Sequence, residues 1–322
     1  VNGHEVVVKA TIGITVGADG DRLAEDVLRD ADTAMYWAKS MDRGSNAVFD
    51  RSMHTRVVGR LHVEADLRRA LDSGELEVHH QPIVHLATDE PAGFEALVRW
   101  QHPERGLVPP ADFLPVAEET GLIRRIDTWV LNQACQELRA WQVAGVVDPE
   151  TQICVNVSNR QFWHGNLTET VSTCLATTGL DPSCLVLEIT EGVIMDDADL
   201  ACAMLAEIHA LGIRVHMDDF GTGYSSLEAL HRLPIDALKI DRSFVWRMGD
   251  DPKSEELVRT IVMMGTNLGL DLIAEGIESA SQQEYLLDLG CRYGQGFWFS
   301  KPVPAVQAEE YLRLRRELRV TA

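Results

Sequence analysis

The sequence from His216 to Leu227, HMDDFGTGYSSL, continues a short apolar run that begins at Ile213. Such a run is typical of a buried strand, and this one ends in two adjacent carboxylates, Asp218 and Asp219. Neighbouring strand residues point to opposite faces, but the chain leaves the pleat at a strand end, so both acids can reach one site. The pair therefore indicates a metal site. The alternative is a helix-capping acid beside a surface turn.

Strand-like runs alternate with helical segments from Glu75 onward. The predicted strands are Leu76–Val84, Gly93–Trp100, Ile153–Val157, Leu185–Thr190, Ile213–Asp218, Ala237–Asp241, Asp271–Gly276 and Gly296–Ser300. The predicted helices are Ala111–Gly121, Ile126–Ala144, Ala198–Leu211, Ser254–Leu268, Ser281–Leu289 and Ala305–Arg319. This pattern predicts an α/β fold, a TIM-type (β/α)8 barrel. A doubly wound open sheet is the alternative, but no glycine-rich nucleotide fingerprint follows the first strand.

Polar residues recur at the ends of these strands, which is unusual for apolar segments. They are Glu95, Asn156, Glu188, Asp218, Asp219, Lys239 and Glu275. In a β/α barrel the strand ends converge on one face, where active sites are built. Buried carboxylates are costly unless they are compensated, and an all-oxygen set suits Mg²⁺ or Mn²⁺ better than Zn²⁺.

Composition limits the classes of partner. The 322 residues carry 29 basic and 50 acidic side chains, a formal charge of −21, which argues against a nucleic-acid polymer. The six cysteines form no CxxC pair and are expected to be buried free thiols in a reducing cytoplasm. No signal peptide or membrane-spanning segment is evident. The chain begins with Val, so we expect that an upstream regulatory domain has been removed, and a membrane anchor there would not be visible.

The first 50 residues predict a strand within Val6–Val16 and a helix over Asp21–Ser40. The sequences TIGITV and LRDADTAMYWAKSMDRGSNAVFD resemble the C-terminal third of a GGDEF, or diguanylate cyclase, domain. The signature loop that gives that family its activity is absent, so cyclase activity is not expected. Residues 51–73 predict a connecting helix, which either packs on the next domain or acts as a signalling lever.

A second resemblance spans about residues 60 to 315, from which we expect a barrel domain over residues 74–322. GFEALVRW, NVSNRQF, LEITEGV, MDDFGTGYSSL, LKIDRSFV, AEGIES and GQGFWFSKP look like the motif series of an EAL domain, the cyclic di-GMP (c-di-GMP) phosphodiesterase of bacterial signal transduction. The resemblance implies a barrel with an antiparallel first strand that hydrolyses cyclic di-GMP to linear 5′-pGpG. It also implies a homodimer formed through the loop after the fifth strand and a nearby helix.

The resemblance assigns roles residue by residue. Glu95, Asn156, Glu188 and Asp218 would hold one divalent cation, and Asp218, Asp219 and Glu275 a second. Lys239 would orient the attacking water, and Glu191 would stabilise the loop from Asp219 to Ser226. Gln81, Leu97, Arg99 and Gln295 would contact the dinucleotide.

Several alternatives remain open on the sequence alone. Lys239 either has a lowered pKa or stays charged and holds water and phosphate. Arg99 lies on the same strand face as Glu95 and either binds a phosphate or forms a salt bridge to a barrel acid. A catalytically silent cyclic di-GMP sensor is the alternative function, and a barrel hydrolase acting on another phosphoester is a third.

Overall fold

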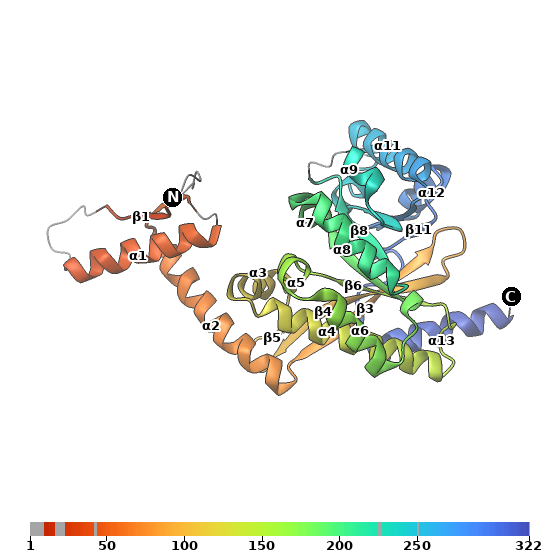
Figure 1. Cartoon of the computed structure of the whole chain (residues 1–322), viewed down its shortest axis with the longest axis horizontal. Helices are drawn as coiled ribbons and strands as arrows, with labels where there is room; N and C mark the ends of the chain where they lie inside the picture. Colours follow the sequence, from red (N-terminus) through yellow and green to blue (C-terminus); the bar gives the residue numbers. More distant parts are fainter. Residues whose placement is uncertain (1–9, 17–22, 42–43, 224–226, 250, 322) are drawn as a thin grey trace. The chain divides into compact units, whose positions relative to one another are not determined.

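The structure, a computed structural model, describes residues 10–16, 23–41, 44–223, 227–249 and 251–321 (Figure 1). The chain divides into two compact units. The first consists of Val1–Gly74 together with Pro109–Leu122, and the second of Glu75–Val108 together with Ile123–Ala322. In the described residues, no helix is long and apolar enough to cross a membrane.

The first unit is built on a short parallel pair of strands, β1 (Ile12–Ile14) and β2 (Asn46–Val48), joined by helix α1 (Ala24–Met41). Gly13 allows the close packing of strand on helix, because a Cβ there would lie 2.0 Å from the carbonyl oxygen of Ala31. The predicted strand and helix are thus present, except that residues 6–9 and 21–22 of the two predicted ranges lie outside the described residues.

Two further helices complete the first unit. The connecting segment forms one helix, α2 (Arg51–Ser73), capped by the Asp50 carboxylate, which accepts a hydrogen bond from the Ser52 amide at 2.8 Å. It ends at Gly74, whose left-handed φ of 73° suits a glycine. Helix α3 (Pro110–Thr120) packs against α2, and Arg60 of α2 pairs with Glu119 of α3.

The second unit is a closed barrel of eight strands surrounded by helices. In spatial order the strands are β3 (Leu76–His85), β4 (Pro91–His102), β6 (Gln152–Asn156), β7 (Leu185–Thr190), β8 (Arg214–Phe220), β9 (Ala237–Ile240), β10 (Asp271–Ala274) and β11 (Tyr293–Gly294). Two short strands lie beside the ring, β5 (Gly106–Val108) and β12 (Val303–Pro304). The predicted TIM-type fold class is confirmed.

The first barrel strand runs against the others. β3 pairs antiparallel with β4 on one side and with β11 on the other, whereas the pairings from β4 through β6 to β11 are parallel. This reversal is the one that the family resemblance implied.

The eighth strand differs from the sequence prediction. We expected it at Gly296–Ser300, but β11 is Tyr293–Gly294 and the following residues form a turn. The turn is tight, since the Ser300 amide donates to the Gly296 carbonyl at 3.2 Å and a Cβ on Gly296 would lie 2.1 Å from the Ile277 carbonyl oxygen. Phe297 and Trp298 of this turn are exposed rather than packed in the barrel wall.

The helices predicted in the second unit are present with shifts of a few residues at their ends. They are α4 (Ile123–Val143), α8 (Ala198–Ala210), α11 (Pro252–Leu268), α12 (Ala280–Asp288) and α13 (Ala305–Thr321). The sequence prediction omitted the shorter helical segments α5 (Asn159–His164), α6 (Leu167–Thr178), η1 (Pro182–Cys184), α7 (Glu191–Asp196), α9 (Leu227–Arg232) and α10 (Arg242–Val245). Most of these have six residues or fewer, too short for an apolar pattern at helical spacing to repeat.

An apolar layer fills the barrel interior below the strand ends. It consists of Ile83, Cys154, Val186, Ala237 and Ile273, each from a different strand, with Tyr293 packed against it. Alternate residues of each strand continue upward from this layer, so the next inward-facing positions carry the polar residues of the site.

Candidate active site

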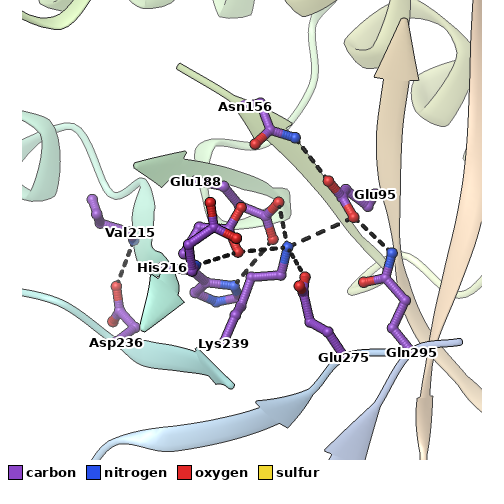
Figure 2. Close-up of polar contacts among 11 residues, drawn as sticks. Glu95, Asn156, Glu188, Val215, His216, Asp236, Lys239, Glu275 and Gln295 are labelled. Carbon is purple, nitrogen blue, oxygen red and sulfur yellow. Dashed lines mark hydrogen bonds and ion pairs between the residues drawn. The ribbon is translucent and has the colours of Figure 1, made fainter. Parts of the chain in front are cut away.

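The structure brings the predicted polar residues together at the carboxyl ends of the parallel strands. Glu95 lies on β4, Asn156 ends β6, Glu188 lies on β7, Lys239 lies on β9 and Glu275 follows β10 (Figure 2). Asp218 and Asp219 lie on β8. The register aligns them, because Asn156 pairs with Glu188 and the Glu275 amide donates to the Ile240 carbonyl at 3.1 Å.

Lys239 is the centre of this cluster and is completely buried. Its ammonium nitrogen lies 2.7 Å from Glu275 Oε1, 2.9 Å from Glu188 Oε2, 3.3 Å from Asp218 Oδ1 and 3.6 Å from Glu95 Oε2. Burial opposes its charge, but the surrounding carboxylates outweigh burial and raise the pKa of Lys239 well above its usual value. Lys239 is therefore charged here, in agreement with one of the two alternatives left by the sequence.

The carboxylates around Lys239 differ in their affinity for protons. Burial raises the pKa of Glu188 well above its usual value and that of Glu275 to about 8, although Lys239 opposes both shifts. The pKa of Glu95 is lowered, because Lys239 and hydrogen bonds from Gln295 and Asn156 outweigh its burial. A single ammonium thus does not compensate all the negative charge of the cluster.

Asp218 and Asp219 reach the same side of β8 through an irregularity in the strand. The register between β8 and β9 shifts between Met217 and Phe220, and Asp219 has a left-handed φ of 53°. Burial and the neighbouring Asp218 raise the pKa of Asp219 to about 6. Carboxylate oxygens of Asp218, Asp219 and Glu275 all lie within 4.8 Å of one another, close enough to hold one cation.

Two amide side chains hold Glu95 in place, and a third is bound to one of them. Asn156 Nδ2 donates to Glu95 Oε1 at 2.7 Å, and Gln295 Nε2 donates to Glu95 Oε2 at 2.6 Å. Gln295 also donates to Gln81 Oε1 at 2.8 Å, and Gln81 Nε2 donates to the Ser300 carbonyl at 3.0 Å. Two of the residues expected to contact substrate are therefore linked to a predicted metal ligand.

The other two expected substrate contacts follow Glu95 along β4. Leu97 and Arg99 alternate onto the same strand face and are half-buried. Arg99 donates to the carbonyl of Val98 at 2.8 Å. Burial lowers the pKa of Arg99, but the nearby acids Glu95 and Glu77 favour its charged form.

Glu191 supports the loop that follows β8. It is the first residue of α7, is 1% exposed, and accepts a hydrogen bond from the Gly221 amide at 2.8 Å through Oε2. A Cβ on Gly223 would lie 2.7 Å from Glu191 Oε1, so the glycine lets the loop approach the carboxylate. Of the predicted loop, residues 224–226 lie outside the described residues.

Two residues near Glu188 were not assigned to the site from the sequence, which predicts a buried free thiol for Cys154 and a packed strand histidine, with a tuning role as the alternative, for His216. Cys154 and His216 lie two positions before Asn156 and Asp218 on strands β6 and β8, so they face inward one step below the acids. Atoms of Cys154, Glu188 and His216 lie within 4.8 Å of one another. Burial, followed by the charges of Lys239 and Arg214, lowers the pKa of His216 to about 3. Their spacing from the acids is the signal that could have indicated this cluster.

Comparison with known families explains the constellation. The family model described as "EAL domain" matches residues 64–302, which is most of the chain. The chain belongs to the EAL-domain family. The acids around Lys239, from Glu95 to Glu275, all lie within the matched segment of this EAL-domain chain.

Curated relatives of this EAL-domain chain are longer than the chain itself. It is 42% identical over 307 residues to "Bifunctional diguanylate cyclase/cyclic di-GMP phosphodiesterase MucR" of Pseudomonas aeruginosa, covering 95% of this chain and 44% of MucR. It is 38% identical to "Cyclic di-GMP phosphodiesterase PdeR" of Escherichia coli, covering 96% of this chain and 46% of PdeR. The chain thus spans less than half the length of these two relatives.

Solved structures agree with this assignment. The structure described as "PaMucR Phosphodiesterase, c-di-GMP complex" superposes with a TM-score of 0.75 at 44% identity, covering 77% of this chain and 99% of that one. The FimX EAL domain of Pseudomonas aeruginosa bound to c-di-GMP superposes with a TM-score of 0.68 at 27% identity, covering 75% of this chain and 96% of that domain.

The donor set of the EAL-domain site fits a divalent metal. It offers several carboxylates with oxygens a few ångströms apart, and Glu188 Oε1 is buried without a hydrogen-bond partner in the described structure. Buried acceptors of this kind are satisfied when a cation binds.

Proposed function

We propose that this chain hydrolyses cyclic di-GMP to linear 5′-pGpG in bacterial second-messenger signalling. The observation that carries the proposal is the ring of carboxylates around Lys239 at the carboxyl ends of the barrel strands. The similarity to proteins whose printed names specify cyclic di-GMP phosphodiesterase, and to a structure containing c-di-GMP, supports the choice of substrate.

Two divalent cations, Mg²⁺ or Mn²⁺, complete the proposed site. Glu95, Asn156, Glu188 and Asp218 would hold the first, and Asp218, Asp219 and Glu275 the second. When bound, such a pair activates water and neutralises charge that develops on the phosphate. Asp218 is the natural shared ligand because it contacts Lys239 and also belongs to the Asp219 and Glu275 cluster.

The residues of the chain position the reactants. Water adds to phosphorus and the bond from phosphorus to the 3′ oxygen breaks, so that one product end carries a 5′ phosphate and the other takes up a proton as a 3′ hydroxyl. Lys239, charged and held at the centre of the acids, orients the attacking water. Leu97 and Arg99 continue the strand face of Glu95, where Arg99 offers a planar fork to a phosphate oxygen. Gln81 and Gln295 contact the dinucleotide from the same side as Glu95.

The experiment is a chromatographic assay of the purified chain with cyclic di-GMP and Mg²⁺, with and without EDTA. We expect pGpG formation that EDTA abolishes and that Glu95→Ala removes. The matched control is Glu256→Ala, which truncates a glutamate on the exposed face of α11 and should leave turnover unchanged. Binding of intact nucleotide without hydrolysis would identify a sensor module, and no binding would exclude the substrate.

We further propose that residues 1–50 are the C-terminal part of a GGDEF-like domain and that the protein is a homodimer. The parallel strand pair joined by a helix is compatible with a GGDEF-like origin of residues 1–50, and the term "diguanylate cyclase" in the name of MucR supports it. Incubation with GTP should yield no cyclic di-GMP, because the signature loop is absent from this sequence.

Light scattering would test the proposed homodimer, and a monomer at micromolar concentration would contradict it.

A further inference from the structure

A second cluster of metal-binding side chains lies inside the barrel, one step below the acids. Cys154, Glu188 and His216 come from the neighbouring strands β6, β7 and β8, and their ligand atoms lie within 4.8 Å of one another. All three are almost inaccessible, with exposed fractions of 1%, 1% and 5%. A thiol, an imidazole and a carboxylate together differ from the all-oxygen site above them.

Two polar atoms of this cluster lack a partner in the described structure. His216 Nδ1 and Glu188 Oε1 are both buried without a hydrogen bond, and the 3.9 Å between them is too long for one (Figure 2). Buried polar atoms without a partner destabilise a fold, so a ligand that satisfies both atoms would be favoured here. The other oxygen of Glu188 is engaged by Lys239 at 2.9 Å, so its carboxylate faces both clusters.

The geometry points to a site for a soft divalent cation such as Zn²⁺, with Cys154, Glu188 and His216 as its ligands. Zinc bonds to sulfur, nitrogen and oxygen are about 2.0–2.3 Å long, which places tetrahedral ligands roughly 3.4–3.8 Å apart. His216 Nδ1 and Glu188 Oε1, 3.9 Å apart, already lie close to this spacing, and the cluster as a whole needs to contract by at most about 1.4 Å. The thiol would release its proton to solvent on binding. Mg²⁺ is disfavoured here because it prefers oxygen ligands.

The cluster is reached from the end of the barrel opposite the acids. A cavity of about 300 Å³ opens there, and both Cys154 and His216 line it. Its walls carry three acids, Asp148, Glu150 and Asp271, against one arginine, Arg214, which pairs with Asp271, so the lining is acidic on balance and attracts cations. The cavity supplies an entry path and room for a water molecule as the fourth ligand, so the site does not depend on the substrate entrance.

Sharing Glu188 would couple this site to catalysis, an effect that rests on the proposed phosphodiesterase function. A soft cation bound to Glu188 Oε1 would compete with Lys239 and with the cation of the oxygen-ligand site for the negative charge of Glu188. We therefore expect Zn²⁺ to inhibit turnover in excess Mg²⁺. In Cys154→Ser the Zn²⁺ concentration for half inhibition should rise at least tenfold, while turnover without Zn²⁺ stays as in the unmodified chain.

Cobalt spectroscopy tests the site without reference to activity. The full chain, with Mg²⁺ in excess, is titrated with Co²⁺, and a near-ultraviolet charge-transfer band from thiolate to cobalt should saturate at one equivalent and disappear when Zn²⁺ is added. Cys154→Ser should abolish the band and His216→Ala should weaken or abolish it. The matched control is Cys291→Ser, another buried thiol of the barrel, which should keep the band.

Two results would overturn the assignment. One is the absence of a thiolate band in the unmodified chain, and the other is a band that persists in Cys154→Ser. X-ray absorption of the zinc-loaded unmodified chain guards against misfolded variants, since a shell without sulfur excludes Cys154. A thiolate band without pGpG formation would leave the metal site standing and reject the enzyme, and the reverse result would reject only the metal site.

Discussion

Lys239 occupies the position in which its charge is most needed. It contacts four carboxylates, one of them fully buried, and its removal would leave their charge without a counterion. Breaking a buried ion pair on one side costs about 3–5 kcal/mol. We therefore expect Lys239→Met to lower the free energy of unfolding by this amount in EDTA, as measured by urea denaturation. Added Mg²⁺ should stabilise this variant more than the unmodified chain, and equal stabilisation of both would contradict the proposed metal ligands.

Glu191 acts on the site through the backbone of the loop after β8. The hydrogen bond that its carboxylate accepts from the Gly221 amide holds the segment that carries Asp219. Removal of residues that orient metal ligands typically costs roughly 10–100-fold in metal affinity or activity. We expect a loss of that size for Glu191→Ala, measured as turnover against Mg²⁺ concentration. Glu228→Ala, on the exposed first turn of α9, serves as its control, and equal behaviour of the two variants would reject the role of Glu191.

The sequence predicted which residues meet at the site but not how they contact one another. Glu95 and Glu188 were predictable because acids in apolar strands are rare, and strand ends of a barrel converge. The hydrogen bonds from Gln295 to Gln81 and to Glu95 join residues 200 or more positions apart, so no local pattern encodes them. Cys154 and His216 resemble ordinary core residues until the barrel closes around Glu188.

At the level of the element, strand β8 ends in a register shift, and the backbone conformation directly after it suits a glycine. Gly221 has a φ of +96°, and a Cβ there would lie 2.9 Å from Phe244 Cε2. We expect Gly221→Ala to destabilise the fold by about 1–3 kcal/mol and to reduce turnover, because Asp219 would move. Gly192→Ala is the matched control, since it meets no atom within 4 Å and lies in helix α7. Thermal unfolding checks both, and equal melting temperatures would contradict the prediction.

The elements that the sequence missed are the ones defined by tertiary contacts. The segment from Gly296 to Ser300 has the composition of a strand. Its Trp298 is nevertheless exposed, and the indole N–H donates a hydrogen bond to Gln283 Oε1 at 2.9 Å. Helix α10 is four residues long and is fixed by the Asp241 cap, which periodicity cannot reveal. The long amphipathic helices and central strands were predictable because their patterns repeat several times.

At the scale of the whole molecule, the division into units predicts where the chain can be shortened. Helix α3 packs on α2 within the first unit. We therefore expect α2 to be needed for the stability of the chain, although it precedes the barrel in the sequence. We expect a chain starting at Asp50 to keep its melting temperature and its turnover. A chain starting at Glu75 should melt several degrees lower because α3 loses α2 and the pair from Arg60 to Glu119. Indistinguishable melting of the two truncated chains would contradict this.

The reversed first strand determines how control can reach this barrel. In an all-parallel barrel the first strand begins at the end remote from the chemistry. Here Leu76, at the start of β3, pairs with Trp100 near the end of β4, so the polypeptide enters the barrel at the rim that carries the acids. A twist or pull on the backbone just ahead of β3 would act first at that rim and not at the opposite end of the barrel. An input domain placed ahead of Glu75 would therefore need no relay through the barrel interior to adjust catalysis.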